Sequence, residues 1–258
     1  MGDLLQVMMP DGSILPMSTL ITVICLMFMY TFVGIVAGFG GALTTMPLIT
    51  MMIPVKMASP VSVTVGTATA LYATFLDRKA VDWKSAMALI IASFVGIPFG
   101  IYILKYTPDH VMKGVLGVFL ITYALYSLLG FVLPKYDKKW LPIPFGFIAG
   151  GFGAAFSTNG PPVVIYGTLR NLDKAAFRGT LNAFFTSNNI GIVIGMLSSD
   201  ILTVDTIKIV ILSLPSMLLG WIIGQLVHKK LSKAFFQKVV YLLLIFSGVV
   251  LLKGAFGI

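Results

Sequence analysis

Two glycine-rich stretches carry the residues best suited to binding a ligand. The first reads GFGGALTTMP from Gly38 to Pro47, and the second reads GGFGAAFSTNGPP from Gly150 to Pro162. In each, glycines let the backbone turn and approach a ligand closely, and a proline suits the first turn of the short helix that follows. A helix N-terminus exposes unpaired N–H groups and the positive end of the helix dipole, which together attract an anion. The two stretches therefore predict an anion site, although glycine-rich runs also serve close helix packing in membranes.

Neutral polar side chains could add hydrogen-bond donors at these stretches. Those in the stretches themselves are Thr44, Thr45, Ser157, Thr158 and Asn159. Asn182, Thr186 and Asn189 lie three and four residues apart in an otherwise apolar run, so they share one helix face. That face either lines a cavity or forms an interhelical hydrogen-bond seam. The charged residues just before it either attract anions or fix the topology, and they are Arg170, Asp173, Lys174 and Arg178.

The composition decides the class of protein that must hold these residues. The chain has 258 residues, of which 58% are hydrophobic and 10% charged, whereas a soluble domain carries about 25% charged residues. A membrane-spanning helix takes about 20 apolar residues, so there is room for roughly ten crossings. Long apolar runs such as Ser18–Gly38 do not fit the alternating strands of an outer-membrane barrel. The sequence predicts an all-α polytopic membrane protein, with residues 1–258 forming a single transmembrane domain.

The ionisable residues disfavour several other functions. The net charge of +9 lies in short loops between apolar runs, which fits topology signals rather than nucleic-acid binding. All nine acidic residues are aspartates, and without glutamate there is no HExxH zinc motif. An intramembrane protease would need a buried base beside Ser157, but His110 and His228 both fall at the ends of apolar runs. We therefore expect no catalytic residue, no metal, no cofactor and no nucleic-acid partner.

Hydropathy divides the chain into ten apolar segments, and two of them are short. At 1.5 Å per residue, 11 to 13 residues reach only about 17 to 20 Å, against a hydrocarbon core of about 30 Å, so these two are half-helices or re-entrant pieces. The distribution of Lys and Arg favours ten crossings with both termini outside and the Arg78–Lys84 loop inside; eight full helices with two re-entrant pieces is the alternative. The segments lie near 17–38, 42–54, 58–76, 84–105, 110–132, 141–158, 161–171, 175–198, 204–227 and 233–256.

Small residues recur along the chain in a shared order, which indicates an internal repeat. The matches, 112 to 124 residues apart, pair Gly34 with Gly146, Gly66 with Gly179, Gly96 with Gly220 and Gly100 with Gly224. Loop charge reverses between the copies, since the basic loop Arg78–Lys84 corresponds to the acidic loop Asp200–Asp205. We predict two inverted-topology repeats of about five segments each, at 17–132 and 141–256. Such repeats point to a transporter with its site near the midplane.

The two motifs, together with NLDKAAFRGTLNAFF at Asn171 to Phe185, resemble the sulfite exporter TauE/SafE family. The first motif has Ala42 where a further glycine is common in the family. The resemblance implies multi-pass transport of small sulfur-containing anions, such as sulfite, thiosulfate or an organosulfonate, across the bacterial cytoplasmic (inner) membrane. The positions that it adds to the substrate-binding candidates are Gly40, Gly41, Pro47, Gly153, Gly160 and Pro161.

Export by alternating access between the repeats is the expected function. An inside-negative potential of 100 mV drives each negative charge outward by about 2.3 kcal/mol, so an anion exporter needs no coupling ion. A passive channel or facilitator for a small solute and an ion-coupled anion importer are the alternatives. The expected partners are a small anionic substrate and the lipid bilayer, and lipid-facing helices leave room for a homodimer.

Overall fold

A computed structural model describes residues 5–38, 40–130, 138, 140–170, 172–227 and 233–256. Within these ranges the chain forms ten α-helices and one 3₁₀ turn, η1 (Arg78–Ala80), while Met8 and Ile14 pair as an isolated β-bridge. The prediction of an all-α protein is confirmed. The helices are α2 (Met17–Ala37), α3 (Gly41–Thr50), α4 (Val55–Asp77), α5 (Trp83–Tyr106), α6 (Asp109–Leu128), α7 (Pro142–Phe156), α8 (Gly160–Leu169), α9 (Lys174–Ser198), α10 (Val204–Val227) and α11 (Lys233–Phe256).

Five of the described helices are long and apolar enough to cross a membrane, namely α2, α5, α6, α10 and α11 from Phe236. They make the chain a multi-pass membrane protein. Helices α4 and α9 are as long, at 23 and 25 residues, but they carry many hydroxyl and amide side chains. These two helices pack against each other and against the apolar helices. The most polar long helices therefore meet inside the bundle, where a polar pathway could lie.

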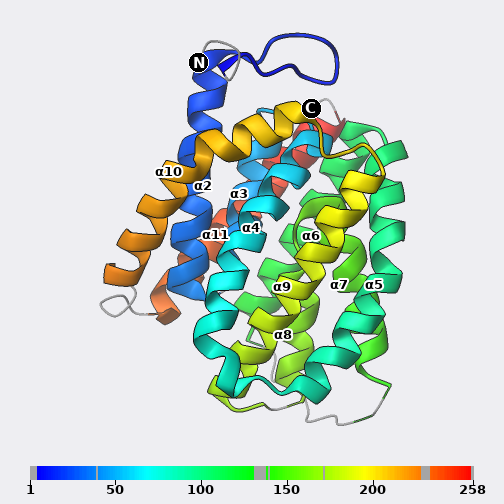
Figure 1. The fold of residues 1–258 in the computed structure, drawn as a ribbon, viewed down its shortest axis with the longest axis vertical. Coiled ribbons are helices and arrows are strands. Elements are labelled where there is room, and N and C mark those ends of the chain that lie inside the picture. Colours follow the sequence, from blue (N-terminus) through cyan, green and yellow to red (C-terminus); the bar gives the residue numbers. More distant parts are fainter. Residues whose placement is uncertain are drawn as a thin grey trace.

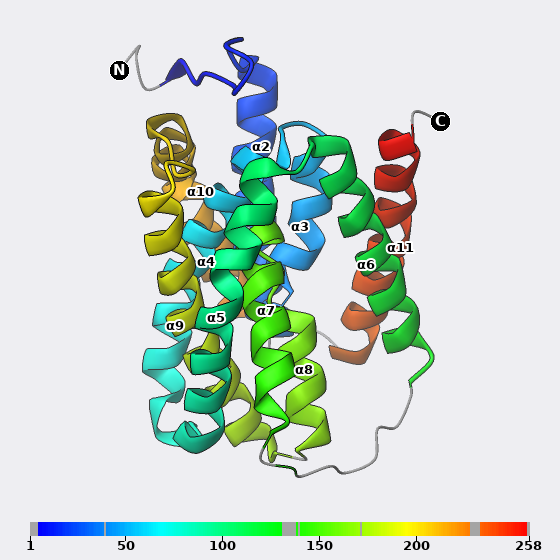
Figure 2. The same ribbon diagram turned by 90° about the vertical axis from the view of Figure 1, so that its right-hand side faces the viewer.

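Both short apolar segments form short helices. Helices α3 and α8 have 10 residues each, which is about 15 Å and half of a hydrocarbon core. Helix α3 lies in the upper half of the molecule and α8 in the lower half (Figure 2). Each follows a longer helix and packs against it. The expected half-helices are thus present, with bounds a few residues shorter than the 42–54 and 161–171 predicted.

Glycines reverse the chain between α2 and α3. Gly38 and Gly40 have φ angles of 83° and 92°, a left-handed conformation that side chains rarely adopt. A Cβ atom on Gly41 would lie 2.3 Å from the Tyr30 carbonyl oxygen, so α3 begins in close contact with α2. Between α7 and α8 the reversal falls instead at Ser157, whose φ is 56°. Each short helix then returns toward the end of the molecule at which its preceding helix began (Figure 2).

The two ends of the molecule differ in what they hold. Helix α2 begins and α11 ends at the same end (Figure 1), here called the terminal end; the opposite end, which holds η1, is called the η1 end. This agrees with an even number of alternating segments, while the orientation in a membrane stays a prediction. At the terminal end, Lys56 Nζ donates to the Lys105 carbonyl at 2.7 Å, and Lys105 Nζ donates to the Ser199 carbonyl at 2.9 Å. These bonds tie together the ends of α4, α5 and α9.

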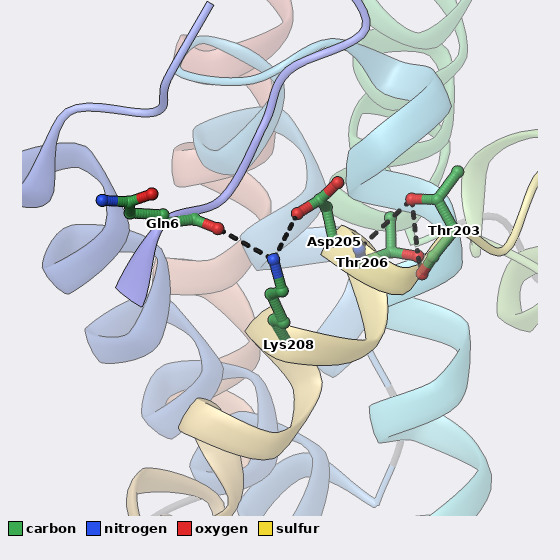
Figure 3. A network of polar contacts seen from close by, with 5 residues as sticks. All are labelled: Gln6, Thr203, Asp205, Thr206 and Lys208. Carbon is green, nitrogen blue, oxygen red and sulfur yellow. Dashed lines mark hydrogen bonds and ion pairs between the residues drawn. The ribbon is translucent and has the colours of Figure 1, made fainter. Parts of the chain in front are cut away.

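The N-terminal segment is also fixed at the terminal end. Lys208 of α10 donates to the Gln6 carbonyl at 2.9 Å and pairs with Asp205 at 3.0 Å (Figure 3). Val7 and Leu15 are buried among core residues. The segment before α2 is therefore packed onto the bundle rather than extended from it.

Backbone-to-backbone contact at glycines joins α5 to α7. A Cβ atom on Gly96 would lie 2.1 Å from the Phe147 carbonyl oxygen, and one on Gly150 would lie 2.1 Å from the Ser93 carbonyl oxygen. Helix α10 meets α2 in the same way, since a Cβ on Gly220 would lie 2.5 Å from the Phe28 carbonyl oxygen. Close packing is thus the role of Gly150, within the second glycine-rich stretch. Gly96 and Gly220, which the sequence pairs in the predicted repeat, thus both lie at close helix–helix contacts.

Asp82 caps α5 at the η1 end. Its carboxylate accepts hydrogen bonds from the Ser85 backbone N–H at 3.3 Å and from the Ser85 hydroxyl at 2.6 Å. The Ser85 hydroxyl, followed by smaller contributions from nearby backbone N–H groups, lowers the pKa of Asp82 from its ordinary value. Its own backbone N–H donates to the Thr180 hydroxyl at 3.1 Å, so the cap also lies against α9.

The Asp82→Ala variant is expected to lose about 1 kcal/mol of stability at neutral pH, as is usual for a lost N-cap. Because the pKa of Asp82 is lowered in the folded state, its stabilisation is complete above the unfolded-state pKa of about 3.9. The stabilisation fades as the pH falls through the lower, folded-state pKa. Thermal unfolding in detergent at pH 7 and pH 3 measures this difference, and a wild-type advantage that stays constant across that range would contradict the assignment.

Candidate transport site

A cavity of about 330 Å³ lies between the two glycine-rich stretches. Its walls come from the C-terminal part of α2, the start of α3, α4, the α7–α8 connection, α9 and Gln225 of α10. It reaches the η1 end, where Leu76, Asp77 and Arg178 line it. Residues from both halves of the chain therefore enclose one space.

The N-terminus of α3 lies at this cavity, and its first amides have no hydrogen-bond partner among the described residues. The first hydrogen bond of the helix runs from the Thr44 N–H to the Gly40 carbonyl at 3.1 Å, so the amides of Gly41, Ala42 and Leu43 precede it. All three residues line the cavity, and the N-cap Gly40 offers no side chain to them. The positive end of the α3 dipole is thus available to a ligand.

The start of α8 is built differently. Its N-cap residue, Asn159, makes no capping bond; instead its Nδ2 donates to Asn188 Oδ1 and to Asn189 Oδ1, both at 2.8 Å. Pro161 and Pro162 follow in the first turn, and proline has no N–H to donate. The α8 side therefore offers fewer backbone donors than the α3 side and more side-chain amides.

Two glycines let these groups come close together. A Cβ on Gly66 would lie 2.3 Å from the Tyr30 hydroxyl and 3.3 Å from Asn189 Nδ2. A Cβ on Gly153 would lie 3.0 Å from Asn159 Cβ and from an oxygen of the Asn188 side chain. Glycine at both positions allows α4 and α7 to approach Asn159, Asn188 and Asn189, here called the asparagine group.

Some of the polar groups in this region have no hydrogen-bond partner among the described residues. Thr158 Oγ1 and Asn188 Nδ2 are buried and make no hydrogen bond among the described residues, and Thr158 lines the cavity. A buried donor without a partner costs about 1–3 kcal/mol. The cavity wall therefore has hydrogen-bonding capacity to spare.

An ion pair lies where the cavity meets the η1 end. The Arg178 guanidinium pairs with Asp77 Oδ1, and Asn182 Nδ2 donates to Asp77 Oδ2 at 2.9 Å. The bonds link the last residue of α4 to the first turns of α9. Arg178 also lines the cavity, and its two possible roles, attracting anions or fixing the topology, both stay predictions.

Eight of the fourteen sequence-predicted site residues line the cavity. They are Gly40, Gly41, Ser157, Thr158, Asn159, Gly160, Asn182 and Asn189. Those that do not line it are Thr44, Thr45, Pro47, Gly153, Pro161 and Thr186.

The hydroxyls outside the cavity are bonded elsewhere. Thr44 and Thr45 donate to the Gly41 carbonyl, at 2.9 and 2.8 Å. Thr186 shares a 2.8 Å hydrogen bond with Thr74 of α4, which is the interhelical seam that the sequence offered as an alternative. Phe39 and Asn171 of the motifs, and His228, lie outside the described residues.

Sequence reasoning missed three residues of the site. Tyr30 lines the cavity, and its side chain interacts with that of Ser157. Asp77 contributes the carboxylate of the ion pair, and Gly66 provides the space beside Asn189. Gly66 alone carried a signal, because it recurs in the repeat pattern as Gly179.

A polar cavity between broken helices, enclosed by apolar membrane helices, is the architecture of a membrane transport protein. The sequence model of the family described as sulfite exporter TauE/SafE matches residues 23–251. The chain belongs to this family, and the resemblance drawn from the three motifs is confirmed. No curated protein and no solved structure matches the chain.

Proposed function

We propose that this protein exports a small sulfur-containing anion, such as sulfite, thiosulfate or an organosulfonate, through the cavity described above. The observation that carries the proposal is the α3 N-terminus, whose first residues Gly41, Ala42 and Leu43 line the cavity and precede the Thr44 N–H bond to the Gly40 carbonyl. Unpaired amides and a positive dipole end bind oxyanions without a countercharge. Thr158, whose hydroxyl has no partner among the described residues, and the Asn189 side chain also line the cavity. Because these donors are neutral, they bind an anion weakly enough for it to be released.

Alternating access is the proposed mechanism, with the two halves of the chain as inverted repeats. In support, α2–α6 and α7–α11 share one order: a helix, a 10-residue helix and three long helices. The packing of α5 on α7 has its counterpart in the packing of α10 on α2. Relative motion of the halves would open the terminal end by breaking the bond from Lys105 to the Ser199 carbonyl, which joins the two halves, and would close the η1 end.

The direction of transport follows from charge. The η1 end carries Arg78, Lys79 and Lys84, and the positive-inside rule assigns such loops to the cytoplasm. The cavity reaches this end, which supports the proposal of an inward-facing state in the cytoplasmic membrane. A membrane potential of 100 mV, negative inside, drives a divalent anion outward by about 4.6 kcal/mol. Export then needs no coupling ion.

Flux of labelled sulfite and thiosulfate in proteoliposomes tests the proposal. Vesicles are clamped at zero potential and at 100 mV of either sign, without a Na⁺ or pH gradient. We expect saturable flux that follows the imposed voltage and shows counterflow. Flux that requires an ion gradient would favour a coupled importer, non-saturable flux would favour a channel, and absence of flux for every sulfur anion would overturn the proposal.

A further inference from the structure

We propose that Arg178 forms a second anion-binding subsite at the η1 mouth of the cavity, and that Asp77 occupies this subsite as an internal competitor when no anion is bound. The inference rests on the proposed function and adds an entry step to it. An arriving oxyanion replaces the Asp77 carboxylate on the Arg178 guanidinium and on the Asn182 amide. It then passes inward to the α3 N-terminus.

The bonding of Asp77 is that of an anion held in a binding site. One carboxylate oxygen receives the guanidinium and the other receives the Asn182 amide at 2.9 Å. A sulfur oxyanion offers the same kind of acceptor oxygens, and guanidinium groups bind them through paired hydrogen bonds. The two donors that satisfy Asp77 could therefore satisfy the substrate instead.

Arg178 is more exposed than Asp77, so an incoming anion can reach the guanidinium before the Asp77 carboxylate leaves it. The Arg178 side chain is 59% exposed and that of Asp77 is 12% exposed. A guanidinium has five N–H donors, so Arg178 retains donors for an arriving anion while it still contacts Asp77. Among the described residues, Asp77 and Arg178 are also the two charged ones in the cavity wall. Their pairing keeps the wall neutral until an anion arrives.

Helix stability does not explain these two charges. Asp77 is the last residue of α4, at the negative end of that helix dipole. Arg178 lies near the start of α9, close to the positive end of its dipole. Asp77 is thus unfavourably placed for the α4 dipole and makes no side-chain capping bond to η1. Arg178, in the second turn of α9, gains nothing from that helix dipole, and a partly exposed ion pair returns little stability. A role in handling the anion accounts for this placement.

Opposite effects of the two partners are the signature of competition. In Asp77→Asn the guanidinium is free, so the half-saturating concentration for sulfite efflux is expected to fall about tenfold, the usual value of one charge-assisted hydrogen bond. In Arg178→Gln it is expected to rise by at least the same factor, because Asp77 then repels the anion. The Arg178→Lys variant, which keeps the charge and loses the paired geometry, should fall between wild type and Arg178→Gln.

Two controls separate this subsite from a purely structural ion pair. Arg78→Gln removes the same charge from the same end, but Arg78 stacks on Phe75 and does not line the cavity, so its half-saturating concentration should stay within about twofold of wild type. The Asp77→Arg/Arg178→Asp exchange restores an ion pair with its partners reversed. We expect this exchange to keep the weakened affinity of Arg178→Gln, because position 178 then carries a carboxylate in place of the guanidinium that binds the anion.

Binding is also measured without transport, as the rise in Tm that sulfite produces in detergent. The rise should be larger in Asp77→Asn and smaller in Arg178→Gln than in wild type, at one sulfite concentration. Loss of affinity in both single variants with rescue in the charge exchange would overturn the subsite and leave the proposed function intact. Wild-type protein that neither transports nor binds any sulfur anion would overturn both.

Discussion

Replacing Asn159 with leucine is expected to reduce anion flux by about 100-fold or more while the protein stays folded in the membrane. The Asn159 amide donates to both Asn188 and Asn189, and leucine leaves two buried acceptors without a donor. These unpaired groups cost about 1–3 kcal/mol of folding stability each. The flux falls for a different reason, because Asn159 lines the cavity and leucine puts an apolar side chain in a polar part of its wall. The branched side chain also fills space in the cavity wall. Proteoliposome flux, normalised to inserted protein, measures the effect.

Thr45→Val is the matched control for Asn159→Leu. Thr45 belongs to the first glycine-rich stretch and is fully buried, but its hydroxyl donates to the Gly41 carbonyl inside its own helix. Valine has nearly the same shape, and the helix retains its other bonds, so flux should remain within about threefold of wild type. Equal losses in the two variants would show that burial, and not the asparagine group, determines transport.

The contrast between Thr45 and Asn159 shows how far the sequence predicts the site. Both residues follow glycines and both can donate a hydrogen bond. A threonine hydroxyl in a helix can donate a hydrogen bond to the carbonyl three or four residues before it, as Thr44 and Thr45 do. Asn159, at a helix N-cap, has no such local acceptor and reaches α9. Local geometry alone therefore ranks the asparagines above the threonines as binding residues.

Long-range pairing is what the sequence could not supply. The short helices follow from segment length and glycine content, so α3 and α8 were predictable within a few residues. Asp77 and Arg178 are 101 positions apart, and nothing in either neighbourhood indicates that the end of α4 meets the start of α9. The polar character of α9 likewise indicated a buried face but not that α4 covers it. These features depend on how the two halves pack, which no local pattern encodes.

Gly150→Ala is expected to destabilise the fold by about 1–3 kcal/mol, the usual effect of overpacking a tight interior. Its new methyl group would lie 2.1 Å from the Ser93 carbonyl oxygen and 2.8 Å from the Ser93 carbonyl carbon. Both atoms belong to the α5 backbone, so relief requires the whole of α5 to move away from α7. No rotation of a side chain can make the space.

Gly254→Ala makes the same chemical change where the structure leaves room for it. Among the described residues, no atom outside the adjoining α11 backbone and the two chain neighbours lies within 4 Å of the Cβ position at Gly254, and alanine is the better helix former by about 1 kcal/mol. The two variants should therefore shift Tm in opposite directions, at about 2–4 °C per kcal/mol for a chain of this size. A gain in Tm for both would mean that α5 and α7 are not in backbone contact. Opposite shifts would show that the first part of the second glycine-rich stretch serves helix packing. Within that stretch, the residues from Ser157 onward would then be the candidates for anion binding.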